Sequence, residues 1–158
     1  MKIRFIRCVA AGLAGMAGMM AVSYFAPRYG LYGLDVPRTL GGIVFRDAQP
    51  ALWFGAALHL LFGALFFPVL YAALAVRLLP GPGALRGWLW AVVLWGLWAY
   101  FGMQLLAAYH PQITGGMMQD PGTLLLNLGP TAPAESLLAH SVYGLLFGWI
   151  CGRPSRSR

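Results

Sequence analysis

Charged residues are what this sequence has least of. Only 9% of its 158 residues are Asp, Glu, Lys or Arg, whereas soluble domains carry about 25%. Hydrophobic residues make up 59% of the chain, and each membrane-spanning helix needs about 20 of them to cross a bilayer core. The composition therefore excludes an ordinary soluble fold and predicts an integral membrane protein.

Cysteine is almost as scarce. The chain has two, Cys8 and Cys151, near opposite termini and each beside a basic segment. Neither belongs to a C-x-x-C or C-x-x-C-H motif. We therefore expect free thiols, either buried or facing the cytoplasm, rather than a disulfide framework.

Enzyme signatures are absent as well. The sequence has no phosphate-binding glycine loop, no paired carboxylates within an apolar segment and no Ser/His/Asp set. Its net charge of +7 does not indicate nucleic-acid binding, because the basic residues cluster at the ends of apolar segments. We predict a protein that is not an enzyme, that has the lipid bilayer as its surroundings, and that binds no nucleic acid and no soluble substrate that the sequence identifies.

Apolar residues are concentrated in four segments, which predict an all-α, single-domain protein over residues 1–158. The expected transmembrane helices cover about residues 5–25, 51–79, 85–109 and 133–151. Pro68 predicts a kink in the second helix, because proline lacks the N–H of a helical hydrogen bond. Each pair of helices would form a hairpin, and the two hairpins would be parallel repeats.

The orientation follows from the distribution of basic residues. Eight of them fall at one side: Lys2, Arg4, Arg7, Arg77, Arg86, Arg153, Arg156 and Arg158. The other side has three basic residues and all four acids: Arg28, Arg38, Arg46, Asp35, Asp47, Asp120 and Glu135. Because Lys and Arg favour cytoplasmic loops, both termini are predicted to be cytoplasmic. In a bacterium this makes a multi-pass protein of the inner (plasma) membrane.

One short motif occurs twice. "HLLFG" and "HSVYG" share the pattern H-x-x-aromatic-Gly, with His59 and Gly63 in the second segment and His140 and Gly144 in the fourth. Both segments enter the membrane from the outer side, so the two imidazoles should lie at similar depth, roughly 10–12 Å below the helix start. Ionisable groups inside a membrane are costly, which makes this pair the candidate site.

Three interpretations of the pair stay open. In the first, His59 and His140 are axial ligands of a haem b, and Gly63 and Gly144 leave room for the porphyrin edge. In the second, the histidines form a bare metal or proton site. In the third, each histidine hydrogen-bonds a backbone carbonyl, Ser136, Ser141 or Tyr71, and each glycine allows close helix contact.

A copper(I) variant of the metal interpretation uses methionine. Thioethers combined with imidazole suit copper(I), and the chain offers Met117 and Met118 beside His110 on the outer side. The methionines of the first segment, residues 16, 19 and 20, are expected to lie too far from Met117 to join them.

Two local patterns predict how the molecule packs. In "GLDVPRTLGG" (residues 33–42), Asp35 can cap a short interfacial helix that has Pro37 in its first turn. In the first apolar segment, Ala11, Gly15 and Gly18 share one face, which would let a partner helix approach closely.

These parts together resemble a family of uncharacterised, small, four-span bacterial inner-membrane proteins. The resemblance rests on the Gly/Ala/Met-rich first span, the Asp-Val-Pro-Arg-x-Leu-Gly loop and the doubled histidine motif, and it covers most of the chain. It implies an association of some members with respiratory oxidases. We therefore expect a non-catalytic accessory subunit of a membrane respiratory or electron-transfer complex, bound to larger membrane subunits. The alternative is a small homo-oligomeric transporter or channel.

Overall fold

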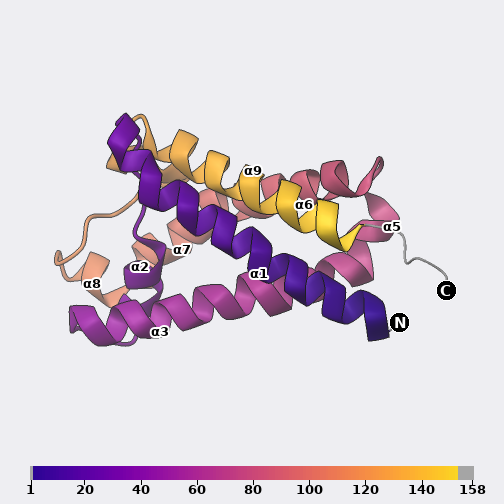
Figure 1. Cartoon of the computed structure of the whole chain (residues 1–158). Coiled ribbons are helices and arrows are strands. Elements are labelled where there is room, and N and C mark those ends of the chain that lie inside the picture. The colour runs from indigo at the N-terminus through magenta and orange to yellow at the C-terminus, as the bar shows by residue number, and fades with distance from the viewer. Residues whose placement is uncertain (1, 153–158) are drawn as a thin grey trace.

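Four helical rods form the protein (Figure 1). The computed structural model describes residues 2–152, and within that range every regular element is a helix. The first rod is α1 (Lys2–Phe25), which continues into the 3₁₀ turn η1 (Ala26–Tyr29). The last is α9 (Ala132–Cys151).

The second and third rods each consist of several helical segments in series. The second comprises α3 (Ala48–Leu61), η2 (Phe62–Phe66), α4 (Phe67–Leu70), η3 (Tyr71–Ala75) and α5 (Val76–Leu78). The third comprises α6 (Gly83–Leu97), η4 (Trp98–Gly102) and α7 (Met103–Tyr109). The η2, η3 and η4 segments are π-helical turns, each one residue wider than an α-turn.

Neighbouring rods alternate in direction. In Figure 1, α1 and the α6–α7 rod run one way, while the α3–α5 rod and α9 run the other. α9 packs along both α1 and α6, so it is the most enclosed of the four. The two histidine-bearing helices therefore run in the same direction, as the hairpin prediction requires.

Three helical stretches are long and apolar enough to cross a membrane: Phe5–Tyr29, Ala48–Leu78 and Gly83–Tyr109. The predicted fourth span is not among those found in the described residues. α9 has 20 residues, but it carries Glu135, Ser136, His140 and Ser141, which make it less apolar. An enclosed helix can carry such groups, because they face other helices rather than lipid.

Around Pro68, where the sequence predicts a kink, the helix contains wider, π-helical turns. Phe67 N–H donates to the Phe62 carbonyl, five residues back, and Pro68 has no N–H to donate. Neither residue therefore reaches the Gly63 carbonyl, which receives the Tyr143 hydroxyl of α9 instead, at 2.6 Å. This bond lies inside the protein and joins the two copies of the repeated motif.

The short helix predicted in residues 33–42 is confirmed as α2 (Val36–Gly42). The Asp35 carboxylate accepts the Arg38 backbone N–H at 3.1 Å and also pairs with the Arg38 guanidinium at 3.0 Å. α2 packs against the start of α3, where Gly55 directly faces the Pro37 carbonyl.

The connection between the third and fourth rods folds back onto the bundle. It contains α8 (Pro111–Thr114) and η5 (Thr123–Leu128). Leu125 of η5 is buried against Met103, Leu106 and Ala132. This loop closes the end of the bundle where α9 begins.

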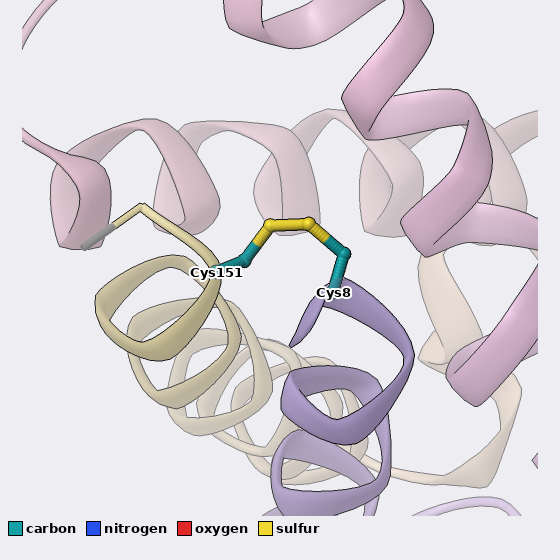
Figure 2. Close-up of a disulfide and its surroundings, with 2 residues drawn as sticks. All are labelled: Cys8 and Cys151. Carbon is teal, nitrogen blue, oxygen red and sulfur yellow. A yellow bond between two sulfur atoms is a disulfide. The ribbon is translucent and has the colours of Figure 1, made fainter. Parts of the chain in front are cut away.

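The expectation of free thiols was wrong. Cys8 and Cys151 form a disulfide that joins the start of α1 to the end of α9 (Figure 2). The two helices run antiparallel and side by side, which brings the chain's extremities together with a Cα–Cα distance of 4.6 Å. Spacing along the sequence, 143 residues, carries no signal of this contact.

The small-residue face of α1 also differs from its predicted use. Ala11 is fully buried, Gly15 packs on Tyr143 and Gly18 packs on Leu146 and Val142. The face thus packs against α9 of the same chain, so the small residues do not form a surface for a partner.

Candidate functional site

His59 and His140 meet at one cavity, as their position in parallel helices predicts. This inner cavity has a volume of about 240 Å³ and lies between α1, the α3–α5 rod, α6 and α9. Its lining is almost entirely apolar: Met16, Met19, Val36, Leu40, His59, Phe62, Gly63, Phe67, Ala91, Leu94, Trp98, His140 and Tyr143. An apolar cavity with two convergent imidazoles is the usual form of a small binding site.

A second cavity adjoins the first. This outer cavity, of about 380 Å³, shares five lining residues with the inner one: Met19, Val36, His59, Trp98 and His140. Its remaining wall is more polar and includes Asp35 and Glu135. The histidine pair therefore separates an apolar chamber from a chamber that contains two carboxyl groups.

The His140 imidazole is held in a defined orientation. Its Nδ1 lies 2.8 Å from the Ser136 carbonyl oxygen one turn earlier in α9. A carbonyl oxygen only accepts, so Nδ1 carries the proton and Nε2 of the neutral ring keeps a free lone pair. A hydrogen bond of this kind, from the ring nitrogen that does not bind the metal, commonly orients a metal-binding histidine.

His59 is less constrained. It is half-buried, and within residues 2–152 its ring makes no hydrogen bond. The Ser136 and Ser141 hydroxyls, which sequence reasoning offered as partners for the histidines, accept instead from Trp95 and Trp88 of α6, each at 3.1 Å. The interpretation in which each histidine makes a hydrogen bond therefore holds for Nδ1 of His140. It gives no role to His59.

The two motif glycines contact neighbouring helices. The Met16 side chain lies directly over Gly63. A methyl group at Gly144 would lie 2.6 Å from both the Gly87 carbonyl oxygen and the Ala91 Cβ of α6. Close helix packing, the third interpretation, accounts for both glycines. Gly144 does not leave room for a porphyrin edge, because α6 packs directly against it.

His110 is placed apart from the pair. It is buried, its Nε2–H donates to the Thr39 carbonyl at 2.8 Å, and its Nδ1 accepts the Gln112 N–H at 3.2 Å. Both ring nitrogens are satisfied, so His110 fastens α2 to the end of α7. It is not available to join Met117, which is exposed.

Sequence reasoning missed three members of the site. Met16 and Met19 were expected to lie too far from Met117 to share a metal site with it. The structure instead places both in the lining of the inner cavity, together with both histidines. Glu135 was counted only as an outer charge, but it is buried and accepts the Ser23 hydroxyl at 2.7 Å. The available signal was the i, i+3 spacing of Met16 and Met19, which puts both on one helix face.

Comparisons with known proteins identify the family of the chain but assign it no activity. No curated protein and no solved structure matches the chain. A family model described as "Family of unknown function (DUF6789)" matches residues 4–158, which confirms the resemblance to an uncharacterised family. Because that match covers almost the whole sequence, the chain belongs to the family of unknown function DUF6789.

Proposed function

We propose that this is a multi-pass protein of the bacterial inner membrane with α9 as its fourth span. Support comes from the three apolar stretches and from α9, whose 20 residues extend about 30 Å at 1.5 Å per residue. Large apolar side chains such as Leu61, Phe66 and Leu97 are exposed along the rods, as lipid-facing residues are.

The proposed orientation keeps both termini in the cytoplasm. Three arginines mark one end of the rods: Arg7 near the start of α1, Arg77 in α5 and Arg86 near the start of α6. These helix ends lie together in Figure 1, and the end is cytoplasmic by the positive-inside rule. The Cys8–Cys151 disulfide joins the start of α1 to the end of α9 and so lies at the same end. Since the cytoplasm keeps thiols reduced, the disulfide of the structure is the observation that opposes this orientation, and the redox state of the pair in the cell decides between the two.

Within that membrane, the protein acts as a non-catalytic accessory subunit that binds a ligand at its histidine pair. The observation that carries this proposal is the convergence of His59 and His140, from two separate helices, on one apolar cavity. Ionisable side chains at such a depth are retained for a function more often than for packing. The respiratory or electron-transfer complex as host rests on the family resemblance alone.

Haem b does not fit this site. Haem propionates are anionic and favour basic partners, but among residues 2–152 no Arg or Lys lines either cavity. Arg38 is paired with Asp35, and the other carboxylate of the outer cavity, Glu135, would repel propionates. The site has the electrostatics of a cation-binding site, and haem is therefore left out of the proposed function.

Purification of the tagged chain from its own host in mild detergent tests the accessory role. We expect it to co-migrate on a native gel with larger membrane subunits and to show no Soret band after those subunits are removed. Isolation of a stable homo-oligomer that moves ions across vesicles would overturn the accessory role and favour the transporter alternative.

A further inference from the structure

Four soft or borderline metal ligands line the inner cavity. Met16 and Met19 come from α1, His59 from α3 and His140 from α9. Both thioethers are almost fully buried, at 3% and 6% exposure, whereas the neighbouring Met20 is 61% exposed. The arrangement therefore singles out two of three adjacent methionines.

The local packing leaves these groups free to bind. Nδ1–H of His140 is engaged with the Ser136 carbonyl, which leaves Nε2 as the free donor atom. Met16 lies over Gly63, one helical turn after His59 and on the same face. A side chain at position 63 would occupy the space of the thioether, so the glycine of the first motif places the sulfur near the first histidine.

The donor chemistry selects copper(I). Thioethers are soft ligands that bind copper(I), and imidazole suits copper as well, whereas magnesium, calcium and manganese favour oxygen ligands. In the part of the chain that the structure describes, no cluster of three or more His, Cys, Asp or Glu residues could hold a harder metal. Four neutral ligands also leave a monovalent ion with a single charge, which is less costly than two charges in an apolar cavity.

The outer cavity provides a route for a cation. It reaches the histidines past Glu135, and a negative side chain in a low-dielectric cleft concentrates cations. The other carboxylate of this cavity, Asp35, is already paired with Arg38. Glu135 is held in place by the Ser23 hydroxyl at 2.7 Å. In the proposed membrane orientation, this route opens at the outer face.

We propose that Met16, Met19, His59 and His140 form a copper(I) site that is loaded through the outer cavity. The proposal deepens the proposed function, since it names the ligand of the same histidine pair. No redox step is required, because the ion is bound and released as copper(I).

The test uses the purified full-length chain in detergent, without oxygen, and copper(I) in competition with a chromophoric chelator. We expect one copper(I) per chain. Removing a residue that only orients a metal ligand costs about 10–100-fold in metal affinity. We expect each single ligand variant to weaken copper(I) binding by at least that factor: Met16→Leu, Met19→Leu, His59→Gln and His140→Asn. The Asn side chain can still donate to the Ser136 carbonyl.

Two control variants separate ligation from packing. Met117→Leu changes an exposed methionine and Met103→Leu changes a fully buried one. Neither residue lines the inner or the outer cavity, so both variants should bind copper(I) as the wild type does. If a ligand variant fails to fold, X-ray absorption of the copper-loaded wild type decides the question. Sulfur and nitrogen neighbours together support the site, and nitrogen neighbours alone overturn it.

Failure of this inference is distinguishable from failure of the proposed function. Cobalt(II) binding that needs His59 and His140, without copper(I) binding, would overturn the copper site and retain the histidine pocket. If neither metal binds in a way that depends on the histidines, both the copper site and the binding function are overturned. The accessory role is measured separately by co-purification.

Discussion

The two copies of H-x-x-aromatic-Gly share a sequence pattern but not an environment. In the first copy, the Phe62 ring is 40% exposed, whereas in the second copy the Tyr143 ring is 4% exposed and stacked on Phe147 at 5.7 Å. α9 is enclosed by α1 and α6, whereas α3 lies at the edge of the bundle. The first copy therefore supplies a half-buried binding residue, His59, at the edge of the bundle. The second copy supplies His140 for binding and Tyr143 for packing.

The same contrast accounts for how each copy is held. α9 is fixed by the disulfide to α1, by the Tyr143–Gly63 hydrogen bond and by the indole N–H groups of Trp88 and Trp95. Of these bonds, only the one to the Gly63 carbonyl reaches the first copy. Changes in the second copy should accordingly cost more stability than matched changes in the first.

The largest effect is expected from the disulfide that fastens the second copy's helix. Oxidised wild type should be more stable than Cys8→Ser by about 2–4 kcal/mol, because the bond restricts the unfolded chain over a long loop. Unfolding in mixed micelles, with and without reductant, measures this difference. Reductant should lower the stability of the wild type and leave the variant unchanged.

The same cysteines also test the proposed orientation. When intact cells are dissolved directly into denaturant with a maleimide, both thiols should be labelled without added reductant, because a cytoplasmic pair is reduced and unfolding exposes the buried Cys8. Protection of both cysteines until reductant is added would place this end of the bundle outside and reverse the topology.

Alanine at the two motif glycines gives the next largest effect. Gly144→Ala should destabilise the protein by about 1–3 kcal/mol, since its methyl group meets α6 backbone that cannot move aside locally. Gly63→Ala meets only the flexible Met16 side chain and should cost less stability while reducing copper(I) affinity. Equal destabilisation by both variants would contradict the asymmetry.

Removing the hydroxyl that joins the two copies is expected to have a smaller effect. Tyr143→Phe leaves the buried Gly63 carbonyl without its partner and should cost about 1 kcal/mol, the low end of the cost of an unpaired buried acceptor, because the change adds no clash. Phe62→Leu, the matched change in the first copy, should remain within about 0.5 kcal/mol of wild type, because the ring is exposed. Thermal unfolding of both variants in one detergent makes the comparison.

The smallest effect is expected at the tryptophan–serine pairs. Ser141→Ala removes the acceptor of the Trp88 N–H and should cost about 0.6 kcal/mol, the average for interhelical side-chain hydrogen bonds in a membrane. Ser136→Ala should behave alike and leave the His140 orientation intact, since that bond uses the backbone carbonyl. A loss of copper(I) binding in Ser136→Ala would show that the hydroxyl takes part in the site.

Much of the fold could be predicted from local sequence patterns. The apolar runs and the Asp35 cap are properties of adjacent residues, so the helices, the hairpins they form and α2 could be predicted from them. The histidine pair could also be predicted, because helix direction and a repeated motif place His59 and His140 at one depth. The roles of the glycines and of the small residues in α1 could not, since a small-residue face does not reveal which helix it meets.

The sequence by itself determined the apolar helices, the order in which they connect and the charge difference between the two ends, because these depend on composition and short-range spacing. Tertiary structure alone decided that Cys8 meets Cys151 and that Tyr143 bonds Gly63. It also decided that Met16 and Met19 share a cavity with both histidines. Each of these contacts depends on which faces of α1, α3 and α9 turn toward one another, and that rotation is set by packing among all four rods.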